Sequence, residues 1–178
     1  MTILVYTPFD KGDTKMVADI IAIVISFIAF IFSLIQFFIE RNRTRKEATI
    51  HAFDKLEESK NFIFLLSLSK SKIDSLVKSK MDCENCIDPQ WEELSKALPL
   101  IEHFAVGINS KTYNIDILNR MAGNQMISLF YNCGTLIQYK RTGQGKEKNY
   151  IEFETMVKKL IEIRQKNNQS IPENTNNR

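Results

Sequence analysis

Residues 20–39 read IIAIVISFIAFIFSLIQFFI and contain no charged side chain. As an α-helix they would extend about 30 Å, which is the thickness of the hydrocarbon core of a bilayer. Asp19 and Glu40 bracket the run. Because lipid offers no hydrogen-bond partners to the backbone, the stretch must be helical if it lies in a membrane. It predicts one transmembrane helix over residues 17–40.

Two other interpretations of this stretch fit less well. A cleaved signal peptide has a shorter apolar core followed by small residues, whereas here the core is long and ERNRTRKE follows it. A buried helix of a soluble protein is rarely apolar over such a length. We therefore expect a single-pass membrane protein.

The basic residues next to the span predict its orientation. Arg41, Arg43, Arg45 and Lys46 follow it directly, and the two lysines before it lie further away among aspartates. The positive-inside rule places such a basic cluster at the cytoplasmic membrane surface. We expect residues 1–16 to be a short tail outside and the C-terminal domain to lie in the cytoplasm, at the inner surface of the plasma membrane.

Small and polar residues recur at regular intervals inside the span. They are Ala22, Ser26, Ala29, Ser33 and Gln36, and every other residue from Ile20 to Ile39 is Ile, Val, Leu or Phe. Their spacings of 4, 3, 4 and 3 put them on one face of a helix. Helices associate in lipid through close packing over small residues and hydrogen bonds between polar ones. The stripe therefore predicts the seam of a homo-oligomer.

Two alternatives to a seam remain open. Ser26, Ser33 and Gln36 could line a water-filled pore through the membrane. A lone helix would instead bond its serine hydroxyls back to its own carbonyls at position i−4, with Gln36 reaching toward the interface. We favour the seam over both.

The chain beyond the span predicts an all-α domain. No Gly or Pro lies between Gly12 and Pro89, so the membrane helix is expected to continue as a stalk to about residue 68. Residues 41–82 would form this stalk and the first helices of a bundle. Residues 83–166 would complete a bundle of about four helices, and the polar residues 167–178 predict a disordered tail.

Turn and cap residues mark the helices of residues 83–166. Asp88 followed by Pro89 predicts a helix start, and Pro99 predicts a kink or a split within that helix. Gly107 predicts its end. Gly123 lies inside the apolar stripe of the next helix, which indicates close packing against a neighbour.

Charge and cysteine content limit the classes of partner. Residues 41–178 carry 22 basic and 17 acidic residues, a net charge of +5. This suits an anionic lipid surface and is too weak to indicate nucleic acid. The odd number of cysteines, three, predicts no disulfide framework, and in a cytoplasmic domain all three should be reduced.

No motif in the chain indicates a metal site or a general acid–base pair. Cys83-x-x-Cys86 is half of a zinc pattern that His103 and Cys133 could complete, but the usual second ligand pair is missing, so we favour two ordinary thiols in a loop. Glu102 and His103 are adjacent on a predicted helix and point about 100° apart, so they would not face one substrate.

The loop after residue 140 does not have the pattern of a phosphate-binding loop. Gly143-x-Gly145-Lys146 lacks the strand, the spacing and the Ser or Thr of that motif. Its basic residues, Lys140, Arg141, Lys146 and Lys148, could touch anionic lipid or RNA, but we favour a solvated loop. No nucleophile with a positioned base is present, so we expect no enzyme, catalytic residue, cofactor or metal.

Short motifs in the second half of the chain form a recognisable set. They are Ile101-Glu102-His103-Phe104, Gly107-Ile108, Tyr113-Asn114-Ile115-Asp116, Met121-Ala122-Gly123 and Tyr150-Ile151-Glu152-Phe153-Glu154. With the apolar N-terminal segment they resemble the DUF4760 family of small bacterial proteins, over residues 15–165. The resemblance implies an N-terminal membrane helix and a helical domain. The family is also broadly similar to membrane-anchored abortive-infection proteins, which implies a role in phage defence.

Two functions follow as hypotheses. The first is a membrane-anchored effector or sensor, in which the cytoplasmic bundle receives a signal and the self-associating span perturbs the membrane. The second is an adaptor, in which the span is only an anchor and the bundle holds a cytoplasmic partner protein at the membrane.

Overall fold

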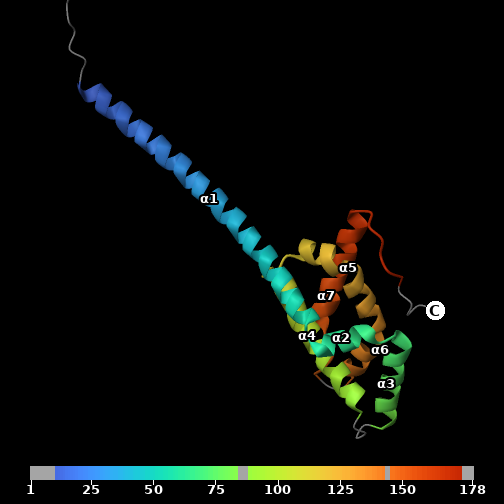
Figure 1. The fold of residues 1–178 in the computed structure, drawn as a ribbon. Helices are drawn as coiled ribbons and strands as arrows, with labels where there is room; N and C mark the ends of the chain where they lie inside the picture. Colours follow the sequence, from blue (N-terminus) through green and yellow to red (C-terminus); the bar gives the residue numbers. More distant parts are fainter. Residues whose placement is uncertain (1–10, 84–87, 143–144, 174–178) are drawn as a thin grey trace, which may run out of the picture. The chain divides into compact units, whose positions relative to one another are not determined.

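The computed structural model describes residues 11–83, 88–142 and 145–173, and within these ranges it contains seven helices and no strand (Figure 1). The helices are α1 (Lys11–Glu57), α2 (Lys60–Ser67), α3 (Lys70–Asp82), α4 (Pro89–Asn109), α5 (Ile115–Asn132), α6 (Gly134–Arg141) and α7 (Ile151–Lys166). The all-α class is confirmed. The expected bundle of about four helices is not confirmed, because the described ranges contain seven helices.

The chain forms two compact units, Met1–Arg43 and Thr44–Arg178. In the first unit, every side chain from Ile20 to Ile39 is exposed. Among the helices described, α1 alone is long and apolar enough to cross a membrane. It is therefore a candidate membrane span.

The expected continuous helix to about residue 68 is wrong, because α1 ends at Glu57 and α2 begins at Lys60. Neither Gly nor Pro causes the break; Ser59 adopts an extended conformation, with φ −69° and ψ 122°. Phe53 and Phe62 are nine residues apart, so a straight helix would put them on opposite faces. The break lets both rings enter one core, where their centroids are 6.5 Å apart.

Side-chain caps begin several helices of the second unit, and the cap at Asp88 is the one that the sequence predicts. The Ser69 hydroxyl accepts the amide of Lys72 at the start of α3. The Asp88 carboxylate accepts the amide of Gln90 at 2.8 Å at the start of α4. These side chains replace the backbone partners that the first turn of a helix lacks.

Helix α4 is not split at Pro99 and ends at Asn109 rather than at Gly107. The expected split and the expected helix end are therefore wrong, and the expected kink stays a prediction. Leu98 and Ile101, on either side of Pro99, are fully buried, and packing on both sides of the proline offsets the lost hydrogen bond. Gly107 instead makes room for Tyr113, because a Cβ there would overlap the tyrosine ring.

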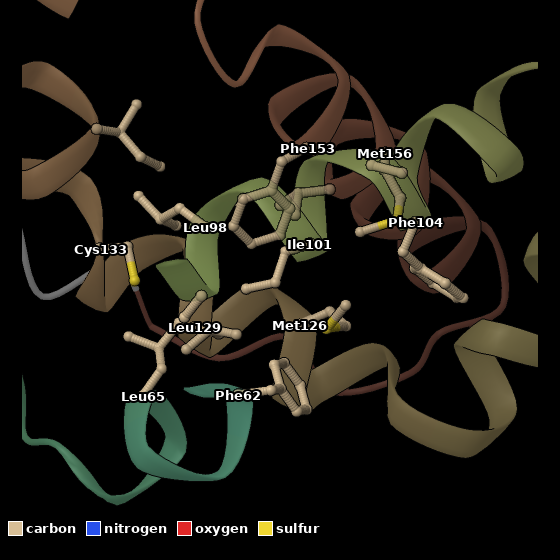
Figure 2. Packing of buried hydrophobic residues seen from close by; sticks show 14 of the residues in the cluster. Phe62, Leu65, Leu98, Ile101, Phe104, Met126, Leu129, Cys133, Phe153 and Met156 are labelled. Atoms are coloured by element: carbon tan, nitrogen blue, oxygen red, sulfur yellow. The ribbon is translucent and has the colours of Figure 1, made fainter. Parts of the chain in front are cut away.

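The core of the second unit forms where α2, α4, α5 and α7 meet. Helix α7 packs between α4 and α5, and α2 packs against α4 (Figure 1). Figure 2 shows side chains from these helices converging, among them Phe62, Leu65, Leu98, Ile101, Met126, Phe153 and Met156. All seven are completely buried. Helices α3 and α6 pack against each other and extend this core.

A polar network lies beside Gly123, which is buried as its sequence context predicts. A Cβ there would come within 2.6 Å of Asn119 Oδ1 and 3.0 Å of Arg164 Nη1. Arg164 Nη1 donates to Asn119 Oδ1 at 3.0 Å, and Arg164 Nε donates to the carbonyl of Ser170 at 2.8 Å. Asn119 Nδ2 also donates to Gln169 Oε1 at 2.9 Å. Part of the segment predicted to be a disordered tail is thus tied to α5 and α7.

Candidate functional site

The predicted membrane seam lies on α1, in the first compact unit. Its residues are Ala22, Ser26, Ala29, Ser33 and Gln36, and all are exposed. The apolar residues between them are exposed too, so exposure alone does not single out the stripe. The Ser26 hydroxyl donates to the carbonyl of Ala22 at 2.8 Å, which is the bond expected of a lone helix. A hydroxyl that donates in this way still has acceptor capacity for a second helix, so the seam stays a prediction.

The predicted basic cluster at the membrane surface is not uniform. Arg41, Arg43 and Lys46 are exposed. Arg45 is half-buried, and its Nη2 donates to the backbone carbonyl of Tyr113 at 3.2 Å. Arg45 therefore holds the segment before α5 against the second part of α1, a role that the sequence did not indicate.

Glu102 has a structural partner in the helix that begins after residue 150. Its carboxylate accepts the backbone amides of Glu152 at 3.1 Å and Phe153 at 2.8 Å. The N-cap residue of α7, Tyr150, has a positive φ of 61° and gives no side-chain cap. Glu102 thus caps α7 from another helix, while the neighbouring His103 is exposed.

The cysteines do not gather into a metal site among the residues described. There, no group of three or more His, Cys, Asp or Glu side chains could hold a metal ion. Cys83 is disulfide-bonded, which differs from the expectation that all three thiols are reduced. Cys133 is buried, and burial raises the pKa of its thiol to about 12, so this thiol is inert. Cys86 lies outside the described residues.

An open cavity of about 570 Å³ lies where the end of α3, the start of α4 and the end of α6 come together. The residues that line it are Lys80 from α3, Trp91 from α4, Tyr139 and Lys140 from α6, and Thr142, Lys146 and Asn149 from the segment after α6. We call this cavity the lysine pocket. Its volume is in the range of ligand sites for small molecules.

Positive charge dominates the lysine pocket. Lys80, Lys140 and Lys146 line it, and none of the described lining residues is Asp or Glu. Burial lowers the pKa of the Lys140 ammonium, and repulsion from Lys146 and Lys80 lowers it further. The Lys140 ammonium donates to the Ser95 hydroxyl at 3.2 Å and lies 5.1 Å from the centroid of the Trp91 ring, and neither of these groups carries a charge. An anion in the pocket would relieve this repulsion.

Aromatic rings form the other wall of the lysine pocket. Trp91 and Tyr139 meet edge to face, with their centroids 5.3 Å apart. Asn149 holds the neighbouring segment in place, because its Nδ2 donates to the carbonyl of Lys140 at 3.0 Å and its carbonyl accepts Arg141 Nε at 2.8 Å. The pocket therefore combines cations with a flat apolar surface on a supported frame.

The sequence indicated only part of this site. It singled out four basic residues near the loop, of which Lys140 and Lys146 line the pocket. Arg141 instead pairs with Glu154 at 2.9 Å, and Lys148 is exposed and is not among the lining residues. Lys80, Trp91 and Tyr139 were missed, because they come together only where α3 packs against both α4 and α6 and where the Trp91 ring meets the Tyr139 ring.

Comparison with known proteins gives one match. The family model described as "Domain of unknown function (DUF4760)" matches residues 23–160, which is more than half of the chain and includes most of the candidate span and all of the lysine pocket. No curated protein and no solved structure is significantly similar to the chain. On the family match, the chain belongs to the DUF4760 family.

Proposed function

We propose that the chain is a single-pass membrane protein that self-associates through its span and acts as a sensor or effector at the bacterial inner membrane. The observation that carries this proposal is the apolar part of α1, where every side chain from Ile20 to Ile39 is exposed. Apolar surface costs about 25 cal/mol per Å² in water, so such a stretch needs a covering. Its length matches the core of a bilayer.

The second compact unit supports the sensing part of the proposal. It has its own buried core and carries a charged pocket open to solvent. A folded domain of this kind can receive a soluble signal while the span stays in lipid. In the first unit, polar and small residues at heptad spacing supply the self-association that would pass the signal to the membrane.

Self-association is tested by crosslinking the full chain in membranes. The variant that combines Ser33→Leu with Gln36→Leu removes two polar side chains from the seam and keeps the span apolar. We expect its crosslinked oligomer to fall by about tenfold or more, since each interhelical hydrogen bond in a bilayer contributes about 0.6–2 kcal/mol.

The matched control combines Phe32→Leu with Ile35→Leu. These positions have the same spacing as Ser33 and Gln36 but lie one residue earlier, off the stripe. The control should crosslink as the wild type does. Undiminished crosslinking of the Ser33 and Gln36 variant would reject the seam.

The proposed orientation, with the helical domain in the cytoplasm, rests on the basic residues after the span. The disulfide at Cys83 speaks against it, because disulfides persist in oxidising compartments and are rare in the cytoplasm. We give the basic residues after the span more weight than the disulfide. These charges set the orientation of the helix while it inserts into the membrane, whereas the disulfide forms only where an oxidant is present. In a reducing cytoplasm this disulfide would be reduced to thiols, so thiol trapping in rapidly acidified cells should label Cys83 without added reductant. Labelling of Cys83 only after reduction would contradict the proposed orientation.

Phage defence is the biological setting that we propose for the effector. It is supported only by the resemblance of the family to abortive-infection proteins. Expression of the chain should lower the plating of at least one phage relative to the Ser33→Leu, Gln36→Leu variant. Equal plating of both across a broad phage panel would contradict this setting.

The adaptor hypothesis has its own supporting observation. A groove of about 290 Å³ in the second unit is lined by side chains of α1 and α4, including Leu56, Leu100 and Phe104. A mainly apolar groove suits a protein partner. Replacing the span with an unrelated monomeric membrane helix separates the two hypotheses, because an adaptor keeps its cellular phenotype after the exchange and a self-associating effector loses it.

A further inference from the structure

We propose that the lysine pocket binds a nucleotide, with the phosphates on its lysines and the base against its aromatic wall. The inference goes beyond the function proposed above, because it holds whether or not the span associates in a membrane. It rests on four features of the described residues: the volume of the cavity, its charge, its aromatic rings and the support of its frame.

The charge of the pocket calls for an anion. Lys80, Lys140 and Lys146 come from different parts of the chain and line one cavity of about 570 Å³. Like charges repel when they are brought together, and a folded protein carries this cost where a ligand repays it. A phosphate chain, with several negative charges and many acceptor oxygens, suits a cavity lined by ammonium groups.

The aromatic wall calls for a flat ring rather than for phosphate alone. Trp91 and Tyr139 line the same cavity and fix each other edge to face at 5.3 Å. Stacking of a base on an aromatic side chain contributes about 1–3 kcal/mol. The Lys140 ammonium already lies 5.1 Å from the Trp91 centroid, so a base would have to stack where this ammonium leaves an aromatic ring open, a contact that inorganic phosphate could not make.

The pocket suits one nucleotide better than a nucleic acid strand or a membrane surface. A strand needs an extended basic groove, but the whole of residues 41–178 carries a net charge of only +5. A membrane surface contacts exposed, convex cations, whereas Lys140 is half-buried and bonded to Ser95. Thr142 and Asn149 also line the pocket and add polar groups that can orient a ligand.

The chain carries its own reporter for this proposal, because Trp91 is its single tryptophan. Ribonucleoside triphosphates are titrated into the full chain in detergent micelles, and binding is followed by tryptophan fluorescence and by calorimetry. We expect a saturable change with at least one triphosphate. Inorganic pyrophosphate and the matching free nucleoside should each bind at least about tenfold more weakly.

Matched lysine variants locate the binding. Lys140→Gln and Lys146→Gln should each weaken binding by about tenfold or more, because each removes a charged donor. Lys148→Gln is the control: it removes the same charge two residues from Lys146, outside the pocket, and should change affinity less than twofold. Trp91→Leu, followed by calorimetry, should weaken triphosphate binding but leave pyrophosphate binding unchanged. Circular dichroism confirms that each variant is folded.

Several outcomes would overturn the proposal. If millimolar triphosphate caused neither binding heat nor a change in tryptophan fluorescence, the proposed nucleotide site would be rejected. An equal loss of affinity in Lys148→Gln would assign the binding to general surface charge. Pyrophosphate as tight as the triphosphate would leave a bare phosphate site, and binding only to vesicles of anionic lipid would make the lysines a membrane contact. Each outcome is independent of the crosslinking result, so it leaves the membrane seam unaffected.

Discussion

Gly107 illustrates how a single residue can have a different role from the one that its type suggests. A glycine near the end of an apolar helical pattern predicts a helix end, but α4 continues to Asn109 and then turns through Lys111, which has a positive φ of 61°. The space left by the missing Cβ is filled by Tyr113, whose ring stacks on Phe104 at 5.5 Å. This second role depends on a distant side chain, so the local sequence could not reveal it.

Replacing Gly107 by alanine tests this packing. The added methyl group would overlap the Tyr113 ring, and we expect Gly107→Ala to lower the free energy of unfolding by about 1–3 kcal/mol. In the Tyr113→Ala background the same change should instead stabilise the protein by up to about 1 kcal/mol, because alanine is the better helix former. Thermal unfolding in micelles of the wild type, the two single variants and the double variant measures both effects of Gly107→Ala. If this substitution changed stability in the same direction with and without the Tyr113 ring, the proposed packing would be contradicted.

Glu154 makes the stability of the domain depend on pH. Its hydrogen bonds with Lys158 and then with Arg141 lower the pKa of its carboxyl below the ordinary value of 4.5. The stabilisation is therefore complete above about pH 4.5 and is lost as the pH falls through the lower pKa of the folded state. Because the side chain is partly exposed, we expect at most about 1 kcal/mol.

The Glu154→Gln variant isolates this contribution. At pH 7 it should unfold more easily than the wild type, and the difference should vanish under acid conditions where both side chains are uncharged. Glu162→Gln, an exposed position on the same helix, is the control and should follow the wild type at every pH. A Glu154→Gln difference that persists unchanged at the lowest pH would exclude the ion pair as its cause.

At the scale of the elements, the start of α7 depends on a side chain from α4. Two amides of its first turn, those of Glu152 and Phe153, are bonded to the Glu102 carboxylate. A negative charge is favourable at this end of a helix because the helix dipole is positive there. Nothing in the local sequence of α7 indicates that its cap comes from 50 residues away.

Removing this cap should loosen α7. We expect Glu102→Ala to destabilise the domain by about 1–2 kcal/mol and to speed hydrogen exchange at the amides of Glu152 and Phe153. Glu102→Gln keeps a hydrogen-bond acceptor but loses the negative charge, so its stability should lie between that of the wild type and that of Glu102→Ala. His103→Ala, the exposed neighbour, should change stability by less than about 0.5 kcal/mol. Unchanged exchange at those two amides in Glu102→Ala would contradict the cap.

Most of the helices could be predicted from the sequence, because their evidence is local. Asp88 caps the helix that it precedes, and Gly123 is buried in the apolar stripe of α5 as its sequence context indicates. The break after Glu57 could not be predicted, since it follows from packing Phe53 beside Phe62. The lysine pocket could not be predicted from the sequence either, because its residues come from three helices and the segment after α6.

At the scale of the molecule, the chain joins two kinds of surface in one sequence. Its second unit buries apolar side chains in the way of a soluble domain, with 26 buried hydrophobic residues in one cluster. Its first unit exposes apolar side chains on every face of α1. A soluble protein does not leave such a stretch uncovered, so we infer that lipid completes the structure.

Membrane extraction of the expressed full chain tests this inference most directly. After alkaline carbonate washing, we predict that the wild type stays in the membrane fraction and is released only by detergent. The Ile28→Lys, Phe32→Lys variant should appear in the wash, since each lysine at the centre of a span costs about 2.5–3.5 kcal/mol. Recovery of the wild-type chain as a soluble monomer without detergent would contradict the account.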